Sequence, residues 1–200
     1  MVSTMSTLAK QHPKPMTSDE FLVWALDQPG RYELVDGYPV RMQSERVRHS
    51  AVKGEIFSAL RAAIRRAGAP CQAWPDGVAV RIDDTRTREP DAVVTCGTTH
   101  DPDALALEGV VIVVEVLSPT NSNTDKLEKL ADYGSVPGLR HYLIVHPSQR
   151  YVIHHRFING PTETRIVRDG DLVLDPPGLT VPLAEMFPPQ EEPTAEAVQG

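Results

Sequence analysis

The most apolar run of the sequence is Val110–Val116, and it carries one charged residue, Glu115. The run is too short to cross a bilayer, and its β-branched side chains predict a strand. A carboxylate within such a strand is costly to bury alone. We therefore expect Glu115 to have a partner, either a basic side chain or a metal ion.

Helical and strand-like patterns alternate along the chain and predict a mixed α/β domain with helices packed against a central sheet. The Thr17–Glu20 capping box begins a short helix that continues to about Ala25. The Asp36-Gly37 pair predicts the turn of a β-hairpin. Further helices are expected at about 48–67 and 124–133. Strands are expected at 32–35, 38–42, 77–82, 91–95, 110–117, 141–146 and 151–158, with another short β segment around 169–171.

The length of 200 residues fits one domain, expected at 17–187 between a disordered leader (1–16) and a disordered Pro- and Glu-rich tail (188–200). The first residues are polar and lack the apolar stretch of a secretory signal. The cysteines, Cys71 and Cys96, have no metal-type or redox spacing. A disulfide between them is one alternative, but we favour reduced thiols in a cytoplasmic protein.

The net charge is −7, yet basic residues are concentrated in one segment. Between Arg41 and Arg88 there are ten basic and five acidic residues, so this segment is net +5 and the remainder −12. A local basic face can attract phosphate, because salt screens charges beyond about 10 Å. We predict Arg48 and Lys53, on the helix at 48–67, as nucleic-acid contacts. The alternative is an ordinary solvated helix surface.

Two acidic residues are expected at the ends of adjacent strands: Asp91, which follows Pro90, and Glu115. Such a pair of carboxylates forms a hard-oxygen site for Mg²⁺ or Mn²⁺. A lysine beside them can hold an attacking water or a phosphate, so the set suits metal-assisted phosphodiester hydrolysis. The plainer alternative for Asp91 is a simple strand-start residue.

The expected helix at 124–133 offers two lysines, Lys126 and Lys129. Asp125, Lys129 and Tyr133 are four residues apart and share one helix face, whereas Lys126 points about 100° away. We therefore predict that Lys129 reaches back toward Glu115.

Several motifs occur in order along the chain. They are Tyr32–Gly37, His49, Glu89–Val94, Val113–Thr120, the Asp125/Lys129/Tyr133 set and Gly138–Val145. Together they resemble the Uma2 family (DUF820), a branch of the PD-(D/E)XK restriction-endonuclease-like superfamily, over roughly Thr17–Met186. In the superfamily pattern a lysine follows the second acid by two residues, but that position is Leu117 here. The Uma2 resemblance implies that the lysine has moved to the following helix.

This resemblance implies a restriction-endonuclease-like α/β core and an endonuclease dependent on Mg²⁺ or Mn²⁺. It implies metal ligands from Asp91, Glu115 and the carbonyl of Val116, with Lys129 as a catalytic residue. The expected partner is nucleic acid, with DNA favoured over RNA, and no membrane. A homodimer is left open.

Two further residues are candidates for the catalytic site. The resemblance implies that Glu33 is an auxiliary metal-site carboxylate or an orienting carboxylate, although a strand residue before a tight turn can simply face solvent. His49, among bases at a helix start, could cap the helix or face phosphate. The rival function is an inactive nucleic-acid-binding or protein-interaction module on the same fold, and a scaffold homodimer is a third. Zinc, phosphate-loop and serine-hydrolase motifs are absent from the sequence.

Overall fold

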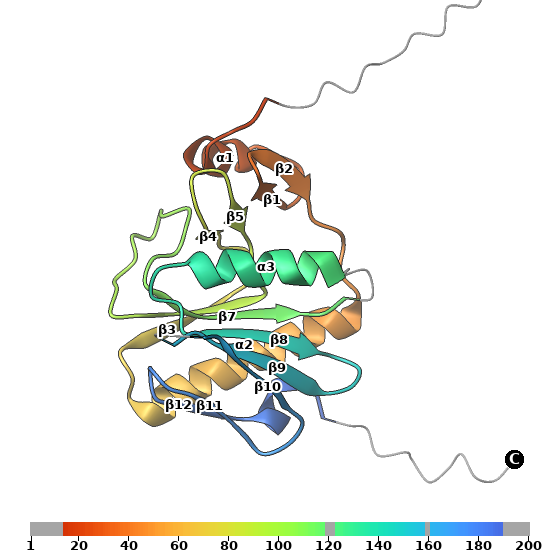
Figure 1. The fold of residues 1–200 in the computed structure, drawn as a ribbon, viewed down its shortest axis with the longest axis vertical. Helices are drawn as coiled ribbons and strands as arrows, with labels where there is room; N and C mark the ends of the chain where they lie inside the picture. Colours follow the sequence, from red (N-terminus) through yellow and green to blue (C-terminus); the bar gives the residue numbers. More distant parts are fainter. Residues whose placement is uncertain (1–13, 119–122, 159–160, 190–200) are drawn as a thin grey trace, which may run out of the picture.

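The computed structural model describes residues 14–118, 123–158 and 161–189 (Figure 1). They form the expected mixed α/β arrangement around a six-stranded sheet of order β10-β9-β8-β7-β6-β3. In that order the strands are Glu163–Val167, Tyr151–Arg156, His141–His146, Val110–Val116, Ala92–Cys96 and Cys71–Pro75. β7 and β8 pair in parallel and the other neighbours are antiparallel, so the sheet is mixed.

One helix covers each face of this sheet (Figure 1). α2 (Val47–Ala67) buries Ile56 and Leu60 against one face, in a core shared with Val114 of β7. α3 (Asn123–Ser135) packs Tyr133 on the other face, in a core shared with Val113. Successive strand residues point to opposite faces, so β7 supplies both cores and reads as an almost continuous apolar run.

α3 is the crossover between the parallel strands β7 and β8, a connection that such strands require. The crossover returns the chain across the end of β7, where Glu115 lies. The placement of α3 between β7 and β8, which the sequence predicted, therefore also brings Lys129 close to the end of β7.

A smaller four-stranded sheet, of order β2-β1-β5-β4, lies beside α1 (Ser18–Ala25) at the top of Figure 1. Its strands are Tyr38–Arg41, Tyr32–Val35, Thr87–Arg88 and Val80–Arg81. The capping box and the hairpin are both confirmed: Thr17 and Glu20 exchange hydrogen bonds, and Asp36 and Gly37 have φ of 49° and 82°. Two charged residues of this sheet, Glu33 on β1 and Arg88 on β5, are joined by a hydrogen bond from Arg88 Nη1 to Glu33 Oε2.

Four strand predictions need correction. β10 was missed, because it is an edge strand whose side chains are mostly exposed. β3 was missed, because it is an edge strand with one buried residue and no clear alternation. The strand expected at 77–82 shortens to Val80–Arg81, and its partner β5 was missed because two residues carry no periodic signal. The β segment expected around 169–171 begins at Asp171: β11 (Asp171–Leu174) pairs with β12 (Leu179–Pro182), and the short 3₁₀ helix η1 (Leu183–Met186) follows.

Cys71 and Cys96 lie directly opposite each other on β3 and β6 and form a disulfide. The expectation of reduced thiols is therefore wrong for this structure. Sequence spacing could not reveal the pair, because the contact depends on the strand pairing of β3. Most of the expected leader and tail lies outside the described residues, so the domain boundaries stay a prediction. Among the helices in the described part of the chain, none has the length and apolar character needed to cross a membrane.

Candidate active site

One cavity of about 900 Å³ opens where the end of β7 meets the starts of β6 and α2. Every residue predicted as catalytic or as a metal ligand lines it: Glu33, His49, Asp91, Glu115, Val116 and Lys129. The predicted nucleic-acid contact Arg48 also lines it, whereas Lys53 does not. The residues come from β1, α2, the β6 start, β7 and α3, so only the fold assembles them.

Asp91 is fixed against the end of β7 by two hydrogen bonds. Its backbone N–H donates to Val114 O at 3.0 Å, and its Oδ2 accepts the backbone N–H of Val116 at 2.6 Å. Antiparallel pairing of β6 with β7 produces this contact, because the start of one strand lies beside the end of the other. The buried carboxylate is thus held next to the Val116 carbonyl by the backbone of the same residue.

Glu115 has its partners on α3. Lys129 Nζ lies 3.0 Å from each Glu115 carboxylate oxygen, and Tyr133 donates its hydroxyl hydrogen to Oε1 at 2.7 Å. Burial raises the pKa of Glu115 to about 7; Lys129 opposes this rise, and the charges of Asp91 and Glu33 add to it. The predicted contact from Lys129 to Glu115 is confirmed, and so is the need for a partner.

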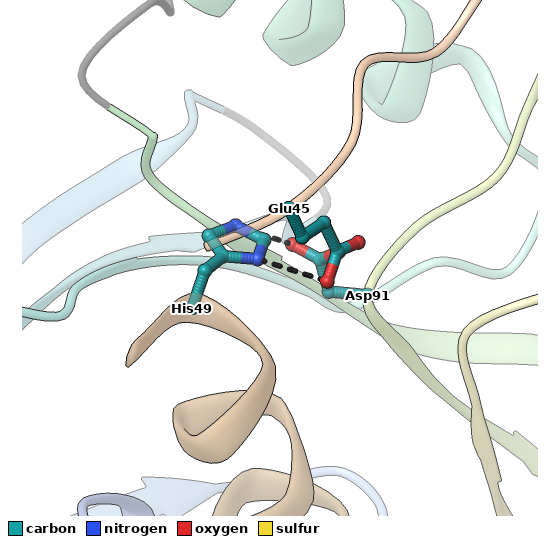
Figure 2. Close-up of side chains that lie close together, drawn as sticks. All are labelled: Glu45, His49 and Asp91. Carbon is teal, nitrogen blue, oxygen red and sulfur yellow. Dashed lines mark ion pairs between the residues drawn. The ribbon is translucent and has the colours of Figure 1, made fainter. Parts of the chain in front are cut away.

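His49 lies on the first turn of α2, and Figure 2 shows its ring beside Glu45 and Asp91. Its Nε2 is 2.8 Å from Val116 O and 3.8 Å from Asp91 Oδ2, and its Nδ1 is 3.4 Å from Glu45 Oε2. Nδ1 is buried and has no hydrogen-bond partner among the described residues. Glu45, His49 and Asp91 offer ligand atoms within 4.8 Å of one another.

Sequence reasoning missed Glu45, which comes just before α2. One signal could have found it: Glu45 is four residues before His49, a spacing that brings two side chains together near a helix start.

Lys53 is the residue whose predicted place needs correction. It is 6% exposed and cannot line an open phosphate-binding face. Its Nζ donates hydrogen bonds to Glu45 Oε1 at 2.5 Å and Asp76 Oδ2 at 2.6 Å, and it is ion-paired with Asp91 Oδ1 at 3.0 Å. The face of α2 that carries Lys53 turns into the molecule, so this lysine belongs to the acidic site.

Glu33 is neither solvent-facing nor isolated. It is 8% exposed, accepts a hydrogen bond from Arg88 Nη1 at 3.0 Å and lies 3.5 Å from Lys129 Nζ. Arg88 is itself buried and also donates to Asp132 of α3 at 2.5 Å. Lys129 thus contacts two carboxylates, Glu115 and Glu33, and the orienting role predicted for Glu33 stays a prediction.

Arg48 is exposed at the rim of the cavity, where its Nη1 donates to Ser148 Oγ at 3.2 Å. Arg41 and Arg46 line the same cavity. The basic segment found in the sequence therefore does reach the site, through these rim arginines rather than through Lys53.

Comparisons with known proteins point to one family. The family model of Uma2, described as "Putative restriction endonuclease", matches residues 18–184. A curated relative, an uncharacterised protein of Synechocystis sp., is 26% identical over 131 residues, which cover 65% of this chain and 68% of the relative.

A solved structure, described as "a putative nuclease belonging to DUF820" from Anabaena variabilis, superposes with a TM-score of 0.66 at 19% identity. The match covers 86% of this chain and 97% of that one, and establishes a common fold. Because the family model spans most of the described chain, this protein belongs to the Uma2 family and has its restriction-endonuclease-like fold.

Proposed function

We propose that the protein is an endonuclease that hydrolyses phosphodiester bonds of nucleic acid, with DNA as the favoured substrate and Mg²⁺ or Mn²⁺ as cofactor. The family description and the nuclease description of the solved neighbour support the reaction class. The observation that carries the proposal is the convergence of Asp91, Glu115, Lys129 and the Val116 carbonyl on one cavity.

The residues of the cavity fit a divalent ion. Asp91, Glu115 and Val116 would hold it through oxygen atoms, the donors that Mg²⁺ and Mn²⁺ prefer. The buried Nδ1 of His49 lacks a hydrogen-bond partner among the described residues, but it lies beside Glu45 on the ring edge away from the Val116 carbonyl, so it does not join the same set of oxygen donors. When bound, such an ion would supply an activated water and stabilise negative charge on the phosphate.

The chain's own residues would do the positioning. The Lys129 ammonium, held between Glu115 and Glu33, is placed to orient a water molecule or to neutralise charge that develops on the phosphate. The Tyr133 hydroxyl donates a hydrogen bond to Glu115 Oε1 and would help Lys129 to keep this carboxylate in one orientation. His49 would hold the Val116 carbonyl in place through its ring nitrogen.

Substrate would enter past the rim arginines. Arg41, Arg46 and Arg48 line the open side of the cavity and can contact backbone phosphates. Such contacts carry no sequence information, so we propose binding with little sequence preference. Its affinity should fall with salt by about 0.9 log units per log unit of salt for each phosphate contact.

Nicking of a supercoiled plasmid in the presence of Mg²⁺ or Mn²⁺ tests the proposal. Wild type should nick, Glu115→Ala and Lys129→Ala should not, and Lys126→Ala should behave like wild type because Lys126 occupies another face of α3. Nicking by Glu115→Ala would contradict the proposal that the reaction takes place at this site. Plasmid binding without nicking in every metal would favour the inactive-module alternative.

A further inference from the structure

The ammonium of Lys53 sits where three carboxylates meet. Its Nζ is within 3.0 Å of an oxygen of Glu45, Asp76 and Asp91. An ammonium has three hydrogens and no lone pair, so it acts here as a compact cation in an oxygen cage. Arg31, 2.6 Å from Asp76, is the next cation in the network.

The contact with Asp91 differs from the other two. Glu45 and Asp76 accept short hydrogen bonds from Lys53, at 2.5 and 2.6 Å, whereas Asp91 Oδ1 is farther from the ammonium, at 3.0 Å. Asp91 Oδ2 is already engaged by the Val116 N–H, so Oδ1 is the oxygen that faces Lys53. Lys53 could therefore give up Asp91 and keep two carboxylate partners.

The lysine remains charged in this environment. Burial acts to lower the pKa of Lys53, but the carboxylates, led by Asp91, raise it overall. The same ammonium helps to keep the pKa of Glu45 and of Asp76 low against the opposing effect of burial. The three ion pairs therefore place a cation directly beside the carboxylate expected to bind metal.

We propose that Lys53 is an internal counter-cation that competes with the divalent ion for Asp91 and thereby sets the affinity of the site for metal. Lys53 is in this sense a positioning residue: it engages Oδ1 of Asp91 while the backbone of β7 holds Oδ2, and it withdraws toward Glu45 and Asp76 when a divalent ion binds. The inference rests on the proposed function, because it concerns the ion that Asp91 would hold.

Titration of the purified protein with Mn²⁺ alone, by isothermal calorimetry and by electron paramagnetic resonance, tests the inference without an activity assay. Lys53→Met removes the charge and keeps the length of the side chain. It should tighten Mn²⁺ binding on the order of tenfold, because the ion no longer displaces a cation. Lys53→Arg keeps the charge and should stay within about threefold of wild type.

Arg31→Met is the matched control, since it removes one positive charge from the same network without a contact to Asp91. It should change Mn²⁺ affinity by less than about threefold. Equal effects of Arg31→Met and Lys53→Met would overturn competition at Asp91 in favour of a general charge effect. Unchanged or weaker binding by Lys53→Met would also overturn it.

The outcomes separate this inference from the proposed function. Wild type that binds Mn²⁺ and nicks plasmid, with no tightening in Lys53→Met, rejects the role of Lys53 alone. If Lys53→Met binds Mn²⁺ and wild type does not, the role of Lys53 is supported, and the proposed metal-dependent activity of the wild-type protein is rejected. If Lys53→Met does not fold, Asp76→Asn serves instead. The loss of the Asp76 charge should strengthen the ion pair between Lys53 and Asp91, so Mn²⁺ affinity should fall. Unchanged affinity would reject the inference.

Discussion

A buried histidine pair lets one stability prediction be worked out in full. His141 on β8 and His154 on β9 are joined through Nδ1 and Nε2 at 2.8 Å, and His141 Nε2 is 2.8 Å from Pro176 O. A carbonyl only accepts, so His141 Nε2 donates to it and His154 Nε2 donates to His141 Nδ1. Burial lowers the pKa of His141 to about 4 and that of His154 to about 3.

Both rings are therefore neutral in the folded protein at pH 5, while an unfolded histidine, with a pKa of 6.5, is mostly protonated. The stability that depends on the neutral rings is present above pH 6.5 and is lost as pH falls toward the folded-state values. Between pH 7 and pH 5 each histidine should remove about 2 kcal/mol from the free energy of unfolding. Glu115 acts in the opposite sense. Because its pKa is raised, its buried carboxyl becomes neutral as pH falls from 7 to 5, and this should add about 2 kcal/mol to the free energy of unfolding.

The variant His154→Gln isolates one histidine. The glutamine amide can still donate to His141 but does not titrate. Urea unfolding at pH 7 and pH 5 should show a loss of stability that is about 2 kcal/mol smaller in His154→Gln than in wild type. The Glu115 contribution cancels in this difference. His146→Gln, outside the pair, should keep the wild-type loss; equal losses in wild type and His154→Gln would refute the reasoning.

Three further predictions concern single contacts. Arg88→Met removes a buried guanidinium shared by Glu33 and Asp132, although Asp132 keeps Arg86 and Glu33 keeps Lys129. The free energy of unfolding, measured in urea, should therefore fall by about 3 kcal/mol, and a fall below 1 kcal/mol would contradict the buried network. Tyr133→Phe removes a hydrogen bond to Glu115, which should lower the free energy of unfolding by about 1 kcal/mol and raise the pKa of Glu115 further. Carboxyl carbon NMR follows that pKa, and a lowered value would contradict the prediction. The Cys71–Cys96 disulfide joins residues 25 apart in the sequence. In the chain-entropy model its reduction should lower the free energy of unfolding by about 3–4 kcal/mol. Melting curves unaffected by reductant would mean that the thiols are not joined.

The sequence was most informative where a residue broke a local pattern. Glu115 interrupts an apolar strand, and Lys129 shares a helix face with Tyr133, so both could be selected without a structure. Their contact was predictable as well, because a helix between two strands returns across the sheet end. The roles assigned to them in catalysis stay predictions.

The rest of the site depends on contacts between distant segments. Asp76 and Arg88 lie on or near very short strands and carry no local signal, yet they reach Lys53 and Glu33 across the molecule. Lys53 itself was misplaced because a charged residue on a helix usually faces solvent. It lies four residues after His49 and three before Ile56, both of which turn inward, and this spacing could have indicated a buried face.

The ion network from β1 through Arg88 to α3 also limits how the chain can be shortened. Glu33 belongs to the N-terminal hairpin, and Asp132 to the crossover helix of the main sheet. A fragment that began after the hairpin would retain Arg88 and Lys129 but lose the carboxylate that pairs with both. The small sheet is therefore part of the smallest unit that would keep the proposed site intact, and a designer who moves this site to a smaller scaffold would have to transfer the hairpin with it.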